Sequence, residues 1–325
     1  MKGHVVKLLG KSCSVRPDTK PPSDPDRLFE CYLRGRLFET GSTQIAVGDR
    51  VEFDPVDESH ALHHPEENAP ERGVIHEILP RRTVLIRPSS AGGGRGKPPQ
   101  VVAANVDQTV VVAAFQQPQY KTGLIDRYLV IAHRAGIAPA ICLNKWDLAS
   151  SEDQAKAHED LKPYERLGIP IVFTSSLSGK GIEELRGLLK GKRSVFVGHS
   201  GVGKSKLAGA VQPGLTLTSS SVSRRGKGRH TTSASTLFSL DFGGELVDTP
   251  GIRELGITDL AQEEIAEHFA DFASFLGHCR FKSCSHIPEP GCAVQQAVES
   301  GGIYQARYDS YVKLYHELAH HHRAS

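Results

Sequence analysis

Gly198-His199-Ser200-Gly201-Val202-Gly203-Lys204-Ser205 decides the fold of this 325-residue chain. The stretch has the pattern G-x-x-x-x-G-K-[ST], follows the apolar run Val195-Phe196-Val197 and precedes an expected helix from Lys206 to Ala210. In that context the glycines let the backbone wrap phosphates and aim N–H groups at them. Lys204 supplies a charge for the β- and γ-phosphates, and the Ser205 hydroxyl is a ligand for Mg²⁺. The stretch therefore predicts a P-loop nucleotide site in an α/β sheet.

A second motif, Asn144-Lys145-Trp146-Asp147, ends another expected strand, Ala140-Ile141-Cys142-Leu143. A carboxylate here accepts hydrogen bonds from both N1–H and the exocyclic amine of guanine, a donor pair that adenine lacks. Because a site built around hydrogen bonds rejects an analogue that lacks them, Asp147 favours GTP over ATP. A P-loop ATPase or kinase with a chance Asn-Lys-x-Asp pattern is the alternative, and competition between GTP and ATP would distinguish the two.

Two further motifs follow short apolar strands. Thr174-Ser175-Ser176 comes after Ile171-Val172-Phe173, so we expect Ser175 and Ser176 to pack beside the base. Asp248-Thr249-Pro250-Gly251 comes after Glu245-Leu246-Val247. There Asp248 would hold Mg²⁺ through water, and the Gly251 N–H would sense the γ-phosphate.

The stretch Arg229-His230-Thr231-Thr232 lies between the P-loop and Asp248. One of the two threonines, Thr231 or Thr232, is expected to complete the Mg²⁺ shell when GTP is bound. The polar and basic residues 219–228 before it predict a switch segment. Ile252 stands where Ras-like enzymes place a water-orienting glutamine, so catalysis must come from elsewhere. His230 is the candidate catalytic residue, and a solvated loop histidine is the equal alternative.

Cys279, Cys284, His286 and Cys292 form a cluster with the spacing Cys-x4-Cys-x-His-x5-Cys. Three thiolates and one imidazole satisfy tetrahedral Zn²⁺ and leave no position for water, so the cluster predicts one structural zinc ion. His278 is a rival ligand. Clustering beside a histidine favours a metal site over disulfides and fits a reducing cytoplasm.

Composition is typical of a soluble globular protein, with 23% charged and 38% hydrophobic residues and a net charge of +2. The charge distribution is more informative. No Asp or Glu lies between Glu184 and Asp241, whereas Arg224, Arg225 and Lys227 fall in that stretch. Such a block suits a phosphate-bearing partner. We expect no signal peptide and no membrane span, because no apolar run is long enough.

Three domains are expected. Short strands punctuated by Gly, Asp and Pro suggest a small β-barrel over residues 1–97. Alternating strands and helices over residues 98–262 predict a parallel α/β sheet. Residues 263–325 are helical around the Cys/His cluster. The Gly- and Pro-rich residues 91–99 are the expected linker after the barrel.

The motif order resembles that of the circularly permuted GTPases, because the base motif precedes the P-loop. It is most similar to the RsgA (YjeQ) family. The resemblance runs from the barrel through Asn105-Val106-Asp107-Gln108, the base motif, the P-loop, residues 228–232 and Asp248-Thr249-Pro250-Gly251 to the Cys/His cluster. It covers nearly the whole chain, with local insertions at residues 60–70 and 91–99. It implies an OB-fold barrel, a circularly permuted α/β P-loop GTPase domain and a small α-helical zinc-binding domain.

The same resemblance implies a cytoplasmic monomer whose GTP hydrolysis is stimulated by the small ribosomal subunit during late maturation of that subunit. It links the histidine that matches His230 to hydrolysis. It also implies rRNA binding, with Arg34, Arg36, Arg81, Arg82 and Arg87 of the barrel as candidate phosphate contacts. A nucleotide-gated RNA-binding module with negligible hydrolysis is the alternative, motivated by Ile252. Phosphate release with and without small subunits would distinguish them.

Overall fold

The structure is a computed structural model of the chain. It describes residues 1–19, 27–34, 44–56, 71–87, 99–217, 235–248, 257 and 260–324, without the side chains of 320–324. None of the helices in these ranges combines the length and the apolar character that crossing a membrane requires.

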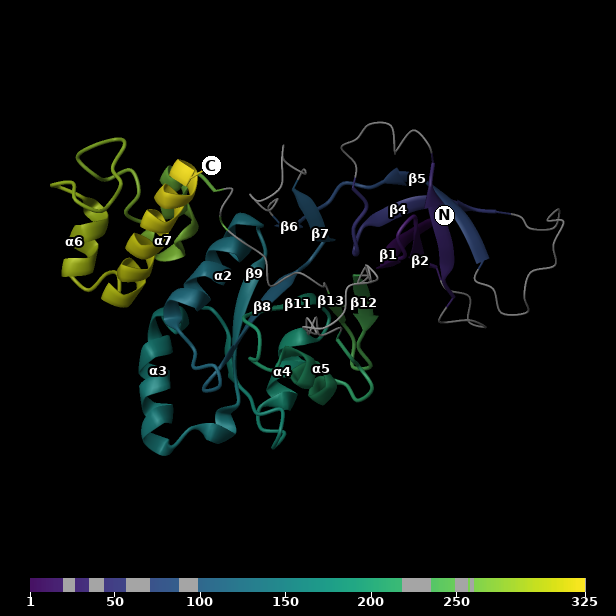
Figure 1. The fold of residues 1–325 in the computed structure, drawn as a ribbon, viewed down its shortest axis with the longest axis horizontal. Coiled ribbons are helices and arrows are strands. Elements are labelled where there is room, and N and C mark those ends of the chain that lie inside the picture. Colours follow the sequence, from purple (N-terminus) through teal and green to yellow (C-terminus); the bar gives the residue numbers. More distant parts are fainter. Residues whose placement is uncertain are drawn as a thin grey trace.

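Five strands at the amino terminus form a closed barrel (Figure 1). They are β1 (Lys2–Leu8), β2 (Ser12–Pro17), β3 (Phe29–Leu33), β4 (Arg50–Pro55) and β5 (Glu71–Ile78). The pairing order is β1-β2-β3-β5-β4, and β4 pairs back with β1. Alternate residues such as Val15, Phe29 and Phe53 are fully buried in the barrel core, as the period of two in a strand requires. This confirms the expected OB-type barrel.

The central domain is an α/β sheet in the order β10-β9-β8-β11-β13-β12. Its strands are β8 (Gln108–Ala114), β9 (Ala138–Asn144), β10 (Ile171–Phe173), β11 (Arg193–Val197), β12 (Thr236–Ser239) and β13 (Glu245–Asp248). All neighbours are parallel except β12 and β13. Every residue of β8 and β11 is buried, which is typical of central parallel strands covered on both faces.

Helices cover both faces of this sheet (Figure 1). They are α2 (Thr122–Arg134), α3 (Ser151–Arg166), α4 (Ile182–Leu189) and α5 (Lys204–Val211), with the short 3-10 helix η2 (Trp146–Leu148) after β9. Buried residues of α4 and α5 pack on one face, with Val112 and Phe196 from the strands. Buried residues of α2 and α3 pack on the other face, with Val111 and Val195.

The barrel and the α/β domain share one continuous sheet of 11 strands, because β1 pairs with β12 at Lys7 and Thr236. A hairpin of β6 (Val84–Arg87) and β7 (Gln100–Ala104) connects the two domains along the chain. The expected boundary between residues 97 and 98 therefore falls between the two strands of one hairpin. A bridge from Val47 to Ala103 also ties β7 to the barrel.

The motif Asn105-Val106-Asp107-Gln108 lies at the joint between barrel and sheet. The Asn105 amide donates to the Gly48 carbonyl at 3.0 Å and accepts from the Arg82 N–H at 2.9 Å. Asp107 accepts from the Arg193 N–H at 2.8 Å, and the Arg193 guanidinium donates to the same Gly48 carbonyl at 2.9 Å. These residues serve to fix the barrel on the sheet.

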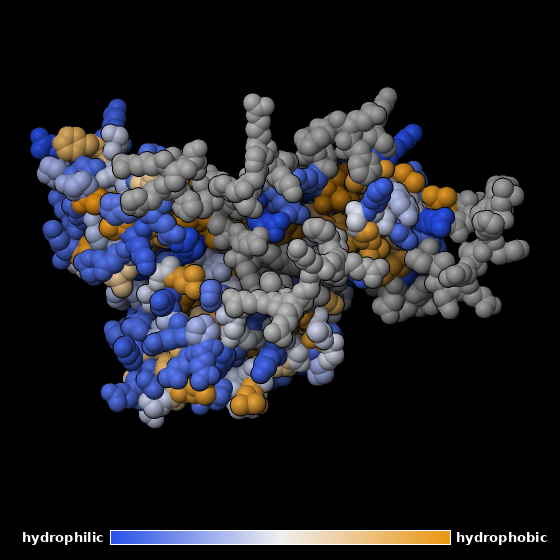
Figure 2. All heavy atoms as spheres, viewed as in Figure 1, coloured by the Kyte–Doolittle hydropathy of each residue, from blue (hydrophilic) through white to orange (hydrophobic). Residues whose placement is uncertain are grey.

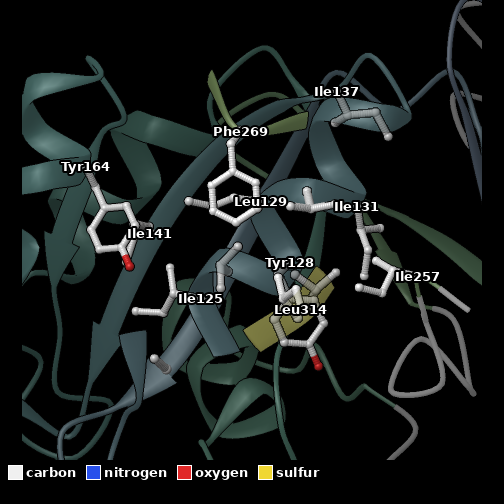
Figure 3. Packing of buried hydrophobic residues seen from close by; sticks show 14 of the residues in the cluster. Ile125, Tyr128, Leu129, Ile131, Ile137, Ile141, Tyr164, Ile257, Phe269 and Leu314 are labelled. Atoms are coloured by element: carbon white, nitrogen blue, oxygen red, sulfur yellow. The ribbon is translucent and has the colours of Figure 1, made fainter. Parts of the chain in front are cut away.

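The C-terminal domain consists of η4 (Gln262–His268), η5 (Ala270–Phe272), α6 (Ala293–Glu299) and α7 (Gln305–Ala324). It packs on α2, whose Ile125 and Leu129 belong to one cluster with Ile141 of β9, Phe269 and Leu314 (Figure 3). One hydrophobic core thus spans both domains.

A buried ionic network crosses the same contact. Arg307 of α7 donates to Asp126 of α2 and to both carboxylate oxygens of Asp271. The Tyr164 hydroxyl of α3 donates to Asp126 at 2.7 Å. Burial raises the pKa of the Asp126 carboxyl, and the positive charge of Arg307 opposes that shift. The network therefore fixes the angle at which α7 meets the central domain.

Candidate nucleotide and metal sites

The P-loop connects β11 to α5 at the carboxyl edge of the sheet, where ligands of parallel sheets bind. Gly198 has a φ of 140°, and a Cβ there would lie 2.1 Å from the Val112 carbonyl oxygen. Gly203 has a φ of 97°, and a Cβ there would lie 2.5 Å from the Asn144 amide nitrogen. These close approaches explain both glycines. The Lys204 ammonium group donates to the carbonyls of Gly198 at 2.6 Å and His199 at 3.0 Å, so it lies over the loop.

Asn144, at the end of β9, joins three of the predicted loops. Its fully buried amide donates to the Val202 carbonyl of the P-loop at 3.0 Å. Its side-chain oxygen accepts from the Thr174 hydroxyl at 3.2 Å and from the Ser176 N–H at 3.3 Å. The side chain therefore holds the base motif, the serine loop and the P-loop in one arrangement.

A hydrogen bond joins Asp147, the expected acceptor for guanine, to the serine loop. The Ser175 hydroxyl donates to the Asp147 carboxylate and accepts from the N–H groups of Leu177 at 3.3 Å and Ser178 at 3.1 Å. Asp147 is exposed. Leu177 is 86% exposed beside it, the most exposed of the large hydrophobic residues in the described ranges.

The two middle residues of the base motif point to different partners. Lys145 adopts a φ of 61°, and its ammonium group donates to the Gln117 carbonyl in the loop after β8. The Trp146 indole is 3% exposed and packs on Phe173 and Phe115 at centroid distances of 4.4 and 5.9 Å. Of the two, Lys145 is held by the loop after β8, whereas Trp146 anchors the motif in the core.

Asp248 ends β13 at the same edge of the sheet and is 9% exposed. β13 is the parallel neighbour of β11. Asp248 at the end of β13 and the P-loop after β11 therefore lie at the same edge of the sheet. His230, Thr231, Thr232 and Gly251 lie outside the described residues.

Sequence reasoning missed the loop between β8 and α2, residues 115–121. It carries the carbonyl that accepts from Lys145, and the ring of Pro118 lies 3.5 Å from the position of a Cβ on Gly201. A backbone carbonyl can belong to any residue, so no side chain in the sequence marks this role.

The four predicted metal ligands come together. The ligand atoms of Cys279, Cys284, His286 and Cys292 all lie within 4.8 Å of one another. The Sγ atoms of Cys279 and Cys292 are 3.9 Å apart, and each lies 3.4–3.5 Å from the Nδ1 atom of His286. A Zn–S distance of about 2.3 Å places two thiolates of a tetrahedral ion about 3.8 Å apart. The donor set and its spacing therefore fit zinc. His278 is exposed and is not part of this cluster.

The loop that carries these ligands, Cys279–Cys292, is here called the metal loop. Glu289 accepts from the N–H groups of Ser285 at 2.9 Å and Ile287 at 3.2 Å. The hydroxyls of Tyr308 and Tyr311 on α7 donate to the His286 and Ser285 carbonyls at 2.8 and 2.6 Å. α7 thus supports the metal loop directly.

Burial raises the pKa of the Cys284 thiol to about 12 and also raises that of Cys292. Only the thiolate is a metal ligand. A bound cation would therefore have to stabilise the ionised sulfurs, and assembly of this site is coupled to proton release.

Most of the barrel arginines named from the sequence already have partners. Arg81 forms a bidentate pair with the buried Asp49, at 2.6 and 2.8 Å. Arg82 pairs with Asp107 at 2.9 Å, and Arg87 donates to Gln100 at 2.6 Å. Arg34 is exposed, and Arg36 lies outside the described residues. The interpretation of Arg81 as a phosphate contact is wrong, because its charge is neutralised inside the barrel.

Comparison with known proteins agrees with this geometry. Residues 78–258 match the family model described as RsgA GTPase. The chain belongs to the RsgA GTPase family. A protein of Chlorobaculum tepidum named small ribosomal subunit biogenesis GTPase RsgA is 42% identical over 281 residues, covering 86% of this chain and 87% of that protein. A Thermotoga maritima protein of the same name is 41% identical over 289 residues, with 89% and 88% covered.

Two solved structures share the whole fold. YjeQ from Thermotoga maritima aligns with a TM-score of 0.78 at 37% identity and 98% coverage of both chains. YloQ, described as a circularly permuted GTPase, aligns with a TM-score of 0.73 at 31% identity, covering 98% of this chain and 94% of that one. The expected family and three-part fold are confirmed.

Proposed function

We propose that this RsgA-family GTPase acts in late maturation of the small ribosomal subunit, and that binding to the subunit stimulates its GTP hydrolysis. The observation that supports this most strongly is the likeness to relatives named small ribosomal subunit biogenesis GTPase, which extends over 86–89% of the chain. Such a role places the protein in the cytoplasm, and we expect it to act as a monomer.

In this proposal Asp147 accepts from the guanine donors, and Ser175 and Ser176 border the base. Residues 198–203 wrap the phosphates with their N–H groups, and Lys204 neutralises the β- and γ-phosphates. Ser205 binds Mg²⁺ directly, and Asp248 does so through water. Thr231 or Thr232 completes the shell in the GTP state, and the Gly251 N–H contacts the γ-phosphate.

His230 is the proposed catalytic residue. Ile252 cannot orient a water molecule, so a polar side chain from the switch segment has to do so. His230 is the titratable residue in residues 228–232 that can orient water or accept its proton.

One zinc ion is proposed to be bound by Cys279, Cys284, His286 and Cys292. Four protein ligands leave no open position, so the ion stabilises the fold of the metal loop and takes no part in hydrolysis.

We propose domain boundaries slightly different from those expected from the sequence. The β6–β7 hairpin supports a first boundary at Asn105, and the start of η4 supports a second at Ala261.

Phosphate release from GTP, measured with and without purified small subunits, tests the proposal, with large subunits as the control. We expect strong stimulation by small subunits alone, and His230→Ala should lower the stimulated rate by about 100-fold. His316→Ala, an exposed histidine on α7, should leave that rate unchanged. Absence of stimulation in the wild-type protein would favour a nucleotide-gated RNA-binding module. A stimulated rate near that of wild type for His230→Ala would remove this residue from the mechanism.

A further inference from the structure

Three neighbouring residues of the metal loop have no role in the sites described above. Arg280, Phe281 and Lys282 lie between the ligands Cys279 and Cys284, and all three are exposed. We call them the loop tip. Phe281 is 44% exposed, and the guanidinium carbon of Arg280 lies 5.5 Å from the centroid of its ring.

The loop tip is held in position at both ends. Cys279 and Cys284 belong to one cluster of metal ligands, which limits how far the residues between them can move. The Arg280 N–H donates to the Gly291 carbonyl at 3.0 Å. Gly291 has a φ of 75°, and a Cβ there would lie 3.1 Å from the Cβ of Arg280. The two segments of the loop that carry these residues are therefore in close contact. A pre-ordered surface loses little conformational entropy on binding.

The charges of the loop tip are available. Among the described residues, neither Arg280 nor Lys282 forms an ion pair. By contrast, Arg27 and Arg50 of the barrel pair with Glu71 and Asp18. Cations without carboxylate partners keep their attraction for phosphate.

The acidic residues near the loop tip are accounted for. Glu289 accepts hydrogen bonds from backbone N–H groups of the metal loop. Glu263 and Glu267 line a hollow together with Phe281 and Lys282, and Arg280 is not among the residues that line it. Arg280 is therefore the main partner for a phosphate, and Lys282, which borders the hollow with the two carboxylates, adds to its charge.

The loop tip lies in the C-terminal domain, on the far side of the central domain from the barrel (Figure 1). The surface of this domain is mostly hydrophilic, with isolated hydrophobic groups standing among charged ones (Figure 2). Phe281 borders the hollow beside the metal loop and has Arg280 and Lys282 as its chain neighbours, which suits a ligand that offers both an aromatic face and negative charge.

We infer that the loop tip binds an unpaired base of RNA. The ring of Phe281 stacks on the base, and Arg280 and Lys282 pair with the phosphates beside it. Exposed bases in RNA loops are recognised in this way, by stacking on aromatic and guanidinium planes. The inference rests on the proposed function, because it takes RNA of the small subunit as the partner.

The test compares Phe281→Ala, Phe281→Leu and Phe281→Trp for binding to small subunits and to a fluorescent single-stranded 12-nucleotide RNA. Stacking on one base corresponds to roughly a tenfold change in affinity. We expect about tenfold weaker binding for the alanine and leucine variants and wild-type binding for the tryptophan variant. Arg280→Ala should weaken binding and reduce its salt dependence. Zinc content and basal GTPase activity should be unchanged in all variants.

Tyr304→Ala is the matched control. Tyr304 is 36% exposed and has the guanidinium carbon of Arg166 5.9 Å from its ring centroid, but it lies outside the metal loop. The Tyr304→Ala variant should bind RNA with the affinity of the wild-type protein.

Wild-type affinity of Phe281→Leu would overturn the inference, because it would mean an apolar protein pocket around the side chain. Wild-type affinity of Phe281→Ala would show that the ring makes no contact. If the alanine variant loses zinc, the leucine and tryptophan variants decide, since both keep a large apolar side chain. Failure of the wild-type protein to bind subunits would refute the proposed function instead, and the single-stranded RNA measurement would still decide on the loop tip.

Discussion

At the scale of single residues, Asn144 shows what a sequence motif leaves out. The motif placed it at the nucleotide, and the structure shows its amide bonded to the P-loop and the serine loop. The hydrogen bonds of a buried side chain depend on loops 30 and 58 residues away, so the motif alone could not show them.

Burial explains the other differences at this scale. Arg81 and Trp146 look like a phosphate contact and a base contact when only their residue types are known. The charge of Arg81 is neutralised by the fully buried carboxylate of Asp49, and the ring of Trp146 is buried against Phe173. Neither environment leaves a local pattern in the sequence.

Leu177 leads to a prediction about the base site. An apolar side chain that is 86% exposed beside Asp147 gains from being covered by the face of a bound base. Partial burial of a leucine contributes about 1 kcal/mol, so Leu177→Ala should weaken GDP binding about three- to tenfold. Displacement of a fluorescent GDP analogue would measure this. Leu9→Ala, at a leucine of the barrel that is 43% exposed, is the control. Unchanged affinity for GDP in Leu177→Ala would show that the base does not cover this side chain.

At the scale of elements, the strands that precede motifs were predictable. Residues 140–143 and 195–197 fall within β9 and β11, because phosphate and base loops need a buried strand before them. The last helix, α7 (Gln305–Ala324), falls within residues 263–325, which were expected to be helical. The pairing of β1 with β12 was not predicted, since it joins residues 7 and 236 and depends on how two domains meet.

The contact between α2 and α7 offers a second prediction. Arg307 is 3% exposed and bridges Asp126 and Asp271. Removing one partner of a buried ion pair leaves an unpaired charge, so Arg307→Ala should lower the free energy of unfolding by about 3–5 kcal/mol. Urea denaturation followed by circular dichroism would measure it.

Arg127 provides the matched comparison, because its pair with Glu317 also links α2 to α7. Its side chain is 25% exposed, so Arg127→Ala should cost less than about 1 kcal/mol. Equal losses for the two variants would mean that burial does not set the strength of this contact.

At the scale of the whole molecule, the strand that follows the predicted switch segment along the chain, β12, lies against the barrel. Thr236, the first residue of β12, pairs with Asp248 on one side and with Lys7 of β1 on the other. Thr236 is therefore a neighbour both of Asp248, the candidate Mg²⁺ ligand, and of the OB-fold barrel. The C-terminal domain contacts α2 on the opposite side of the sheet through Arg307. The barrel and the C-terminal domain are thus both in direct contact with the central domain.

The central claim is that this permuted GTPase recognises guanine through Asp147 while it acts on the small subunit. The most direct test is to measure subunit-stimulated hydrolysis by the Asp147→Asn variant. An asparagine presents one acceptor and one donor, which matches xanthine and mismatches guanine. In the presence of small subunits, the variant should lose GTP hydrolysis by at least about 100-fold and should hydrolyse xanthosine triphosphate instead. Wild-type protein should show the reverse preference. Stimulated GTP hydrolysis at the wild-type rate in Asp147→Asn would contradict the account.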